Sequence, residues 1–131
     1  MLKTKSIFAP IEDSDGIRIS IMSRHTLNDG KTPDSRITPA DYEEHCTRLA
    51  PVPRLVGRLK RQEISFSFFE KKFNQYLETP IVAEEITRIS RMAMDRNVTL
   101  MCAEATPEEC HRRLVAEKCK AIFDSLPLLI N

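Results

Sequence analysis

The segment from Val98 to Ala103 most constrains the fold, because it is apolar on both faces apart from Thr99. A continuous apolar run of this length is typical of an interior parallel strand, whereas a half-exposed strand alternates apolar and polar residues. Shortly after it comes Thr106-Pro-Glu-Glu109, which combines a capping box with proline at the first helical position. A buried strand, a tight turn and a capped helix in this order are typical of an α/β fold.

Two further strands are predicted, over residues 6–9 and 17–23. The second alternates at period two, with its isoleucines, Ile17, Ile19 and Ile21, on the more buried face. Helical patterns separate this strand from the apolar one, so crossover connections are required. The sequence therefore predicts one small α/β domain over residues 1–131. Its partly parallel sheet has three or more strands flanked by helices, in a Rossmann-like three-layer arrangement.

Four helices are predicted from capping residues and apolar spacing. Their expected limits are Thr38 to before Pro51, a capping box at Ser67 to Glu78, Thr79 to a left-handed stop at Asn97, and Thr106 onward. Apolar side chains at helical spacing are expected to face the core: Tyr42, Cys46, Leu49, Phe66, Phe69, Phe73, Leu77, Val82, Ile86, Ile89, Ala93, Val115, Cys119, Ile122 and Leu126. Glu84 and Arg88 are spaced to form an ion pair on the third helix.

Charge and composition argue against several classes of partner. The 131 residues carry 20 basic and 19 acidic side chains, a net charge of +1, so no overall field attracts nucleic acid or anionic lipid. The one basic segment, residues 54–61, has no interleaved aromatic residue and is typical of a solvated face. No apolar run approaches the roughly 20 residues that span a bilayer, and the start of the chain lacks a secretory signal. We therefore expect a cytoplasmic protein without membrane contact, whose four cysteines are free thiols.

A candidate site follows from the expected sheet. If the Val98 strand lies beside the Ile17 strand, the residues after both strands share one rim, where open α/β sheets bind ligands. The rim is predicted to contain Arg24, His25, Cys102, Glu104, Cys110, His111 and Arg112. Arg24 and Arg112, with His25 and Cys102, are candidate binding residues for an anion, because a guanidinium matches two acceptor oxygens. The alternative for Arg112 is pairing with glutamates on its own helix surface.

Cys110 is the candidate nucleophile, assisted by His111 or Arg112, and Glu104 or His25 is the candidate polar orienter or proton carrier. A position in the first turns of a helix lowers a thiol pKa, since the helix dipole stabilises the thiolate. Nearby glutamates oppose this effect, and the adjacent side chains of Cys110 and His111 diverge about the helix axis. The alternative is a small buried side chain. Seven residues separate Cys102 from Cys110, which is a poor match to a structural zinc site, so neither a metal nor a cofactor is expected.

The motifs resemble one widespread prokaryotic family. Ser6-Ile-Phe-Ala9 and Ser14-Asp-Gly-Ile-Arg18, with Leu100-Met-Cys-Ala-Glu104 and Cys110-His-Arg112, are similar to segments of domain of unknown function 488. The resemblance implies a cytosolic α/β fold without an established activity. Arg24 matches an arginine of the family, whereas the Trp-Pro-Arg-Gly that follows it in many members is missing here.

The residues support three functional hypotheses. The first is binding of, or action on, a small anionic ligand at the carboxyl rim of the sheet. The second is a cysteine-dependent enzyme that uses Cys110. The third is a non-catalytic interaction module that uses the basic segment 54–61.

Overall fold

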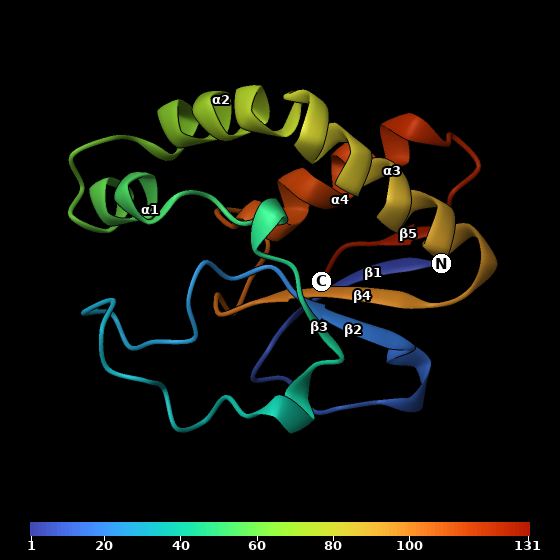
Figure 1. The fold of residues 1–131 in the computed structure, drawn as a ribbon, viewed down its shortest axis with the longest axis horizontal. Coiled ribbons are helices and arrows are strands. Elements are labelled where there is room, and N and C mark those ends of the chain that lie inside the picture. Colours follow the sequence, from blue (N-terminus) through green and yellow to red (C-terminus); the bar gives the residue numbers. More distant parts are fainter.

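Five parallel strands form one sheet in the order β3-β2-β4-β1-β5. The computed structural model describes residues 1–131, and Figure 1 shows its ribbon. The strands are β1 (Leu2–Ser6), β2 (Ile17–Ser20), β3 (Glu44–His45), β4 (Val98–Cys102) and β5 (Leu128–Leu129). The apolar strand β4 is central and lies between β1 and β2, so the predicted pairing of the Val98 and Ile17 strands is confirmed. The sheet is parallel throughout.

Four α-helices lie on one face of the sheet (Figure 1). They are α1 (Pro53–Lys60), α2 (Phe66–Leu77), α3 (Pro80–Asp95) and α4 (His111–Ile122). The connections over residues 7–16 and 21–43 cover the other face and contain two 3₁₀ turns, η1 (Asp13–Asp15) and η2 (Pro39–Asp41). A third turn, η3 (Thr47–Leu49), precedes α1. The α/β class is confirmed, with 3₁₀ turns in place of α-helices on the second face.

The main core lies between the sheet and the helix layer. Leu2, Ile19 and Leu100 point from three adjacent strands toward fully buried side chains of the helices, such as Phe73 and Leu114. The predicted inward residues of α3 and most of those of α2 are buried as expected. Ile122 is 45 % exposed at the end of α4, contrary to the prediction, because that helix ends beyond the edge of the core.

A charged cluster occupies the opposite face. Lys3 and Lys5 on β1 each place Nζ 3.0 Å from Asp15 Oδ1, and Arg18 on β2 donates to the same carboxylate. All four side chains are at least nine-tenths buried. Burial alone raises the pKa of Asp15, but hydrogen bonds from the Glu12 amide and from the two lysines outweigh it and hold the pKa far below its ordinary value.

This cluster explains why the first strand lies at 2–6 and not at 6–9. The alternating lysines in Lys3-Thr-Lys5 indicate an exposed segment when considered without a partner, yet Asp15 compensates both charges inside the fold. Arg18, on the polar side of β2, is buried for the same reason, whereas Ser20 on that side is buried with its hydroxyl against His25.

The helix predicted from Thr38 to Pro51 does not form. Thr38 caps a turn as expected, since its Oγ1 accepts a hydrogen bond from the Ala40 amide, but the turn is the short 3₁₀ helix η2. The chain then pairs with β2 as strand β3, with Glu44 opposite Ile19. Pairing with the sheet edge overrides a helical spacing that extends over only three apolar residues.

Several local boundaries also differ from the prediction. Ser65, not Ser67, caps α2 by accepting from the Phe68 amide. Helix α3 begins at Pro80 as predicted, but Asn97 is not left-handed, because the chain leaves the helix through an extended Arg96.

Arg88 provides a further correction on α3. It pairs with Glu85 one turn earlier and with Glu44 on β3, and not with Glu84. Glu85 is held toward Cys46, whereas Glu84 points to solvent, so the contact with β3 decides which carboxylate is within reach.

Helix α4 begins at His111 with Cys110 as its N-cap, four residues later than the Thr106 capping box predicts. The Thr106-Pro-Glu-Glu109 segment forms a turn instead, closed by a hydrogen bond from the Cys110 amide to the Pro107 carbonyl. Cys110 is joined to Cys102 on β4, and the helix begins at the next residue.

Candidate functional site

A cavity of about 440 Å³ opens at the carboxyl ends of β2 and β4. The long loop over residues 22–36 forms one wall, and helix α1 with the following Arg61 forms another. Cys102, Ala103 and Glu104 belong to its floor, where β4 ends. The predicted rim of the sheet is therefore a hollow, as expected for the carboxyl end of a parallel sheet.

The predicted site residues divide between the cavity and its surroundings. Those that line the cavity are Arg24, Cys102, Glu104 and His111, whereas His25, Cys110 and Arg112 do not line it. The two loops that were expected to share one rim do so, but three of the seven side chains point elsewhere.

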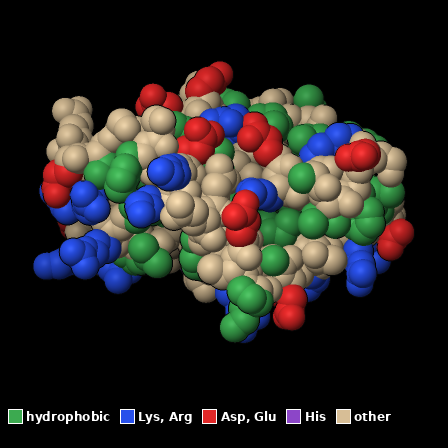
Figure 2. Space-filling model, turned by 90° about the horizontal axis from the view of Figure 1, so that it is seen from above, with side chains coloured by type: hydrophobic (Ala, Val, Ile, Leu, Met, Phe, Trp, Pro, Cys, Tyr) green, Lys and Arg blue, Asp and Glu red, His purple; other side chains and the backbone are tan.

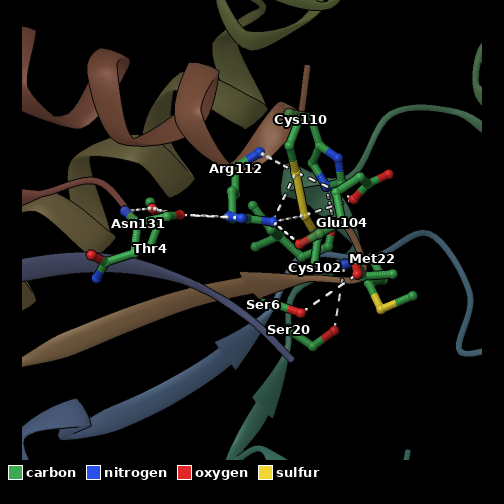
Figure 3. Close-up of a disulfide and its surroundings, with 12 residues drawn as sticks. Thr4, Ser6, Ser20, Met22, Cys102, Glu104, Cys110, Arg112 and Asn131 are labelled. Carbon is green, nitrogen blue, oxygen red and sulfur yellow. Dashed lines mark hydrogen bonds between the residues drawn. A yellow bond between two sulfur atoms is a disulfide. The ribbon is translucent and has the colours of Figure 1, made fainter. Parts of the chain in front are cut away.

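Cys102 and Cys110 are joined in a disulfide (Figure 3). This corrects the expectation of four free thiols, since only Cys46 and Cys119 are free. Burial raises the pKa of each of these two thiols to about 11, and for Cys46 the neighbouring Glu85 carboxylate adds to the effect. The free thiols are therefore packing residues. The sulfur atoms of the disulfide are the ones that lie beside the cavity.

Arg112 lies beside the disulfide (Figure 3) and is fully buried. Its Nη1 donates to the Glu104 carbonyl at 2.7 Å and lies 3.3 Å from Cys102 Sγ and 3.4 Å from Cys110 Sγ. Nε and Nη2 donate to the Asn131 carbonyl at 3.2 and 3.1 Å. Burial lowers the pKa of this guanidinium below its ordinary value. Arg112 therefore cannot clamp a ligand in the cavity, nor does it pair with surface glutamates, because the protein interior uses its donors.

Glu104 contacts the same sulfur atoms from the solvent side. Its Oε2 lies 3.1 Å from Cys102 Sγ and 3.3 Å from Cys110 Sγ, and the residue is exposed. The disulfide therefore lies between an exposed carboxylate and a buried guanidinium.

His111 forms part of the cavity wall but has one ring nitrogen committed. Its Nε2 lies 2.6 Å from the Ile21 carbonyl, so Nε2 carries the proton and Nδ1 is the free acceptor. The ring meets Phe73 edge to face, with centroids 5.7 Å apart. Burial lowers the pKa of His111 below its ordinary value, which keeps the imidazole neutral.

His25 does not line the cavity, although the sequence predicts it among the ligand-binding residues. Its Nε2 is 2.7 Å from Ser20 Oγ, and its ring stacks on His45 with centroids 4.1 Å apart. Burial and the neighbouring His45 lower the pKa of His25. The loop turns this side chain back over the end of β2, while Arg24 points to the cavity.

Three cations at the cavity have no carboxylate partner: Arg24, Lys31 and Lys60. The other two are neutralised locally, because Arg36 pairs with Asp34 and Arg61 with Glu63. Figure 2 shows Lys and Arg side chains gathered at the end of the molecule that carries α1, on the left as in Figure 1. Sequence reasoning missed Lys31 and assigned Lys60 to a solvated face. The available sequence signal is the loop over residues 24–36, which is rich in turn-forming residues and longer than most loops of a compact domain.

Two groups of side chains have donor atoms close enough to share a metal ion. Donor atoms of Cys102, Cys110 and His111 lie within 4.8 Å of one another, as do those of Glu44, Cys46 and Glu85. In the first group the two sulfur atoms are bonded to each other, and His111 offers Nδ1 alone. In the second, Arg88 already binds both carboxylates.

Comparison with known proteins assigns the family. A model described as domain of unknown function DUF488 matches residues 4–119. The chain belongs to the DUF488 family. No curated protein and no solved structure shows significant similarity to it. The match covers the whole cavity floor and both loops that form its rim, so the site is part of the DUF488 domain. No helix of the chain has the length and apolar content needed to cross a bilayer.

Proposed function

We propose that this DUF488 protein binds a small anionic ligand in the cavity at the carboxyl end of its sheet. The observation that carries the proposal is the set of three cations, Arg24, Lys31 and Lys60, that line one cavity without a carboxylate partner. The lining also contains four carboxylates, Asp29, Asp34, Glu104 and Glu109, against five cations in all. Cations without an ion-pair partner in a hollow attract an anionic group and raise its local concentration.

The chemistry of the three cations suits phosphate or carboxylate groups. Arg24 donates only one hydrogen bond, from Nη1 to the Gly30 carbonyl at 3.1 Å, which leaves the rest of its guanidinium for two acceptor oxygens. Lys31 on the loop and Lys60 on α1 come from different walls, so a ligand with two anionic groups can contact both. The volume of about 440 Å³ is within the range of roughly 300–1,000 Å³ typical of small-molecule sites.

The basic segment 54–61 supports the same proposal. Two of its basic residues, Lys60 and Arg61, line the cavity. Part of the charge of the segment therefore faces the hollow and is not available to a separate partner surface. A net charge of +1 gives no additional support for a nucleic-acid partner.

A second candidate function is thiol chemistry at the cavity floor. The observation that favours it is the Cys102–Cys110 pair, held between Glu104 and Arg112. In the cytoplasmic compartment that we propose for this chain, thiols are kept reduced, which favours the dithiol form of the pair. Cys110 then serves as a thiol next to the helix N-terminus, as the sequence predicts.

Isothermal titration calorimetry with citrate and pyrophosphate tests anion binding, with glycerol as the uncharged comparison. Arg24→Ala and Lys60→Ala are each expected to weaken anion binding by about tenfold, the effect of losing one charge-assisted hydrogen bond. Arg54→Ala is the matched control, because Arg54 is an exposed cation of the same helix that does not line the cavity. Equal weakening in all three variants, or no binding of either anion, contradicts the proposal.

A further inference from the structure

We infer that Cys102 and Cys110 form a thiol–disulfide exchange couple whose co-reactant is a small anionic thiol, or its disulfide, seated in the cavity. The inference rests on the proposed anion site for the charge of the co-reactant. The reaction itself is inferred from the two sulfur atoms and the residues that contact them.

The first argument is the uncompensated charge of Arg112. The side chain is fully buried, and its direct partners are the Glu104 and Asn131 carbonyls and the two sulfur atoms. The carboxylates of Glu104 and Glu108 act on it only from beyond ion-pair distance. A buried cation without a counter-ion is costly. Reduction of the disulfide supplies one, since a thiolate on either sulfur would lie 3.3–3.4 Å from Nη1. Glu104 Oε2 lies 3.1 and 3.3 Å from the same two sulfur atoms and opposes a thiolate, so the reduced, charged state also requires this carboxylate to take up a proton or to move away with its turn. With that change, the surroundings of the pair suit a thiolate as well as the disulfide.

The second argument is the helix that begins at Cys110. As the N-cap of α4, Cys110 receives the Arg112 amide at 3.5 Å from its Sγ. Helix N-termini lower the pKa of a thiol by stabilising its thiolate. A more stable thiolate is a better leaving group in disulfide exchange, so Cys110 is suited to be the sulfur that departs.

The third argument is the position of Cys102 and Glu104. Cys102 belongs to the cavity floor and Cys110 does not, so a molecule in the cavity approaches Cys102 first. Cys102 has no exposed surface in this state, and attack therefore requires the exposed 103–109 turn to move aside. Glu104, on that turn, contacts both sulfur atoms and solvent, so it can carry protons between them.

The proposed reaction balances as follows. A thiolate in the cavity attacks Cys102 Sγ, the Cys102–Cys110 bond breaks, and its electron pair goes to Cys110 Sγ beside Arg112. A second thiolate then attacks the ligand sulfur of the mixed disulfide, which releases Cys102 and a small disulfide. Two small thiols are oxidised, one protein disulfide is reduced, and two protons pass from the small thiols to the cysteines. The reverse direction oxidises the dithiol with a small disulfide.

The charge of the co-reactant is tested on the oxidised, folded protein with three thiols of similar size. They are 3-mercaptopropionate, 2-mercaptoethanol and cysteamine, which are anionic, neutral and cationic. Each rate of disulfide reduction, read by mass spectrometry in the presence of a chelator, is divided by the rate of the same thiol with a small soluble disulfide to remove intrinsic reactivity. We expect the normalised rate to be about tenfold or more higher for the anion than for the cation. Lys60→Ala should reduce this preference and Arg54→Ala should not.

The identity of the attacked sulfur is tested with single cysteine variants. Cys110→Ser, treated with the disulfide of 3-mercaptopropionate, should accumulate a mixed disulfide on Cys102. Cys102→Ser should form little adduct on Cys110. Cys46 and Cys119 serve as internal controls, because both are buried free thiols that should stay unmodified.

Two outcomes overturn the inference in distinguishable ways. If no small thiol reduces the pair until urea unfolds the protein, the exchange couple is wrong, while calorimetric binding of citrate can still support the anion site. If exchange proceeds equally with all three thiols, the anionic class of co-reactant is wrong, and with it the role of Lys60, while the couple itself stands.

Discussion

The guanidinium of Arg112 donates to the main-chain carbonyl of Glu104 at 2.7 Å and thereby ties the start of α4 to the turn that follows β4. The same side chain reaches the Asn131 carbonyl through two further nitrogen atoms. One buried cation therefore connects the cavity floor, the helix and the last residue of the chain.

Replacement of Arg112 by methionine should destabilise the fold. Methionine retains much of the side-chain volume but removes the guanidinium donors to the Glu104 and Asn131 carbonyls, and leaves Asn131 with the Thr4 hydroxyl alone. A hydrogen bond from a charged donor contributes about 1.5–3 kcal/mol. We expect the free energy of unfolding to fall by about 2–4 kcal/mol. Urea denaturation of the oxidised protein measures this change. Arg113→Met is the control, because Arg113 forms only partly exposed ion pairs on the same helix. Similar losses in both variants contradict the assigned role of Arg112.

Asp15 should make the free energy of unfolding depend on pH in the acidic range. Its pKa is far below the ordinary value of 3.8 in the folded protein, so the folded state binds fewer protons than the unfolded state does. The resulting stabilisation is fully present above pH 3.8 and is lost as the pH falls toward the lowered pKa. Asp15→Asn removes this dependence.

At neutral pH, Asp15→Asn also leaves Lys3, Lys5 and Arg18 buried without a carboxylate, at an expected cost of about 3–5 kcal/mol. Asp13→Asn in the same turn is the matched control, since Asp13 is exposed. Chemical denaturation at several pH values distinguishes the two. If Asp15→Asn loses stability at low pH as the unmodified protein does, other carboxylates control this pH dependence.

The two histidines with lowered pKa values should make the protein less stable below neutral pH. Burial lowers the pKa of both His25 and His111 in the folded state, so the unfolded state binds more protons once the pH falls below about 6.5. Stability is therefore greatest above that pH and declines as the pH falls through 6.5 toward the folded-state pKa values.

Each histidine contributes up to about 1.4 kcal/mol per pH unit to this decline. The expected result is a shallower loss of stability between pH 7 and pH 5 in His111→Gln, and also in His25→Gln. Imidazole proton resonances in the folded protein should titrate with midpoints below 6.5. Midpoints above 6.5 contradict the prediction and would require charge partners that outweigh burial.

Gly16 should tolerate no side chain. Its φ is +63°, and a Cβ built there would lie 2.0 Å from the Asn97 carbonyl oxygen, to which the next residue is hydrogen-bonded. Gly30 has a similar φ of +70° but faces open space. Gly30→Ala is therefore expected to cost about 1–2 kcal/mol from backbone conformation alone, and Gly16→Ala at least about 3 kcal/mol. Thermal denaturation of the two variants compares the effects directly, and equal melting temperatures contradict the close contact with Asn97.

Elements with strong local patterns could be predicted. Helix α3 has proline at its first position and four apolar side chains at helical spacing, and β4 is an unbroken apolar run, so both formed where expected. Elements whose position depends on contacts with distant residues could not be predicted. Strand β1 carries Lys3 and Lys5, whose burial depends on Asp15, and β3 replaces a helical pattern because β2 offers an open edge.

The candidate site shows the same division. Strand order brings the loops after β2 and β4 together, so the place of the cavity and the inclusion of Arg24, Glu104 and His111 followed from the sequence. The direction of each side chain did not. His25 turns away onto His45 and Arg112 turns inward, because each finds neutral or backbone partners that are distant along the chain.

By itself, the sequence determined the α/β class, the central position of the apolar strand and the rim at which functional side chains gather. These properties depend on apolar periodicity and on capping residues, which act over a few neighbouring positions. Only the tertiary structure decided that Cys102 meets Cys110, that Arg112 is an internal cation and that Lys31 and Lys60 face the cavity. Such contacts depend on how distant segments share space and compensate charge, and no local pattern encodes them.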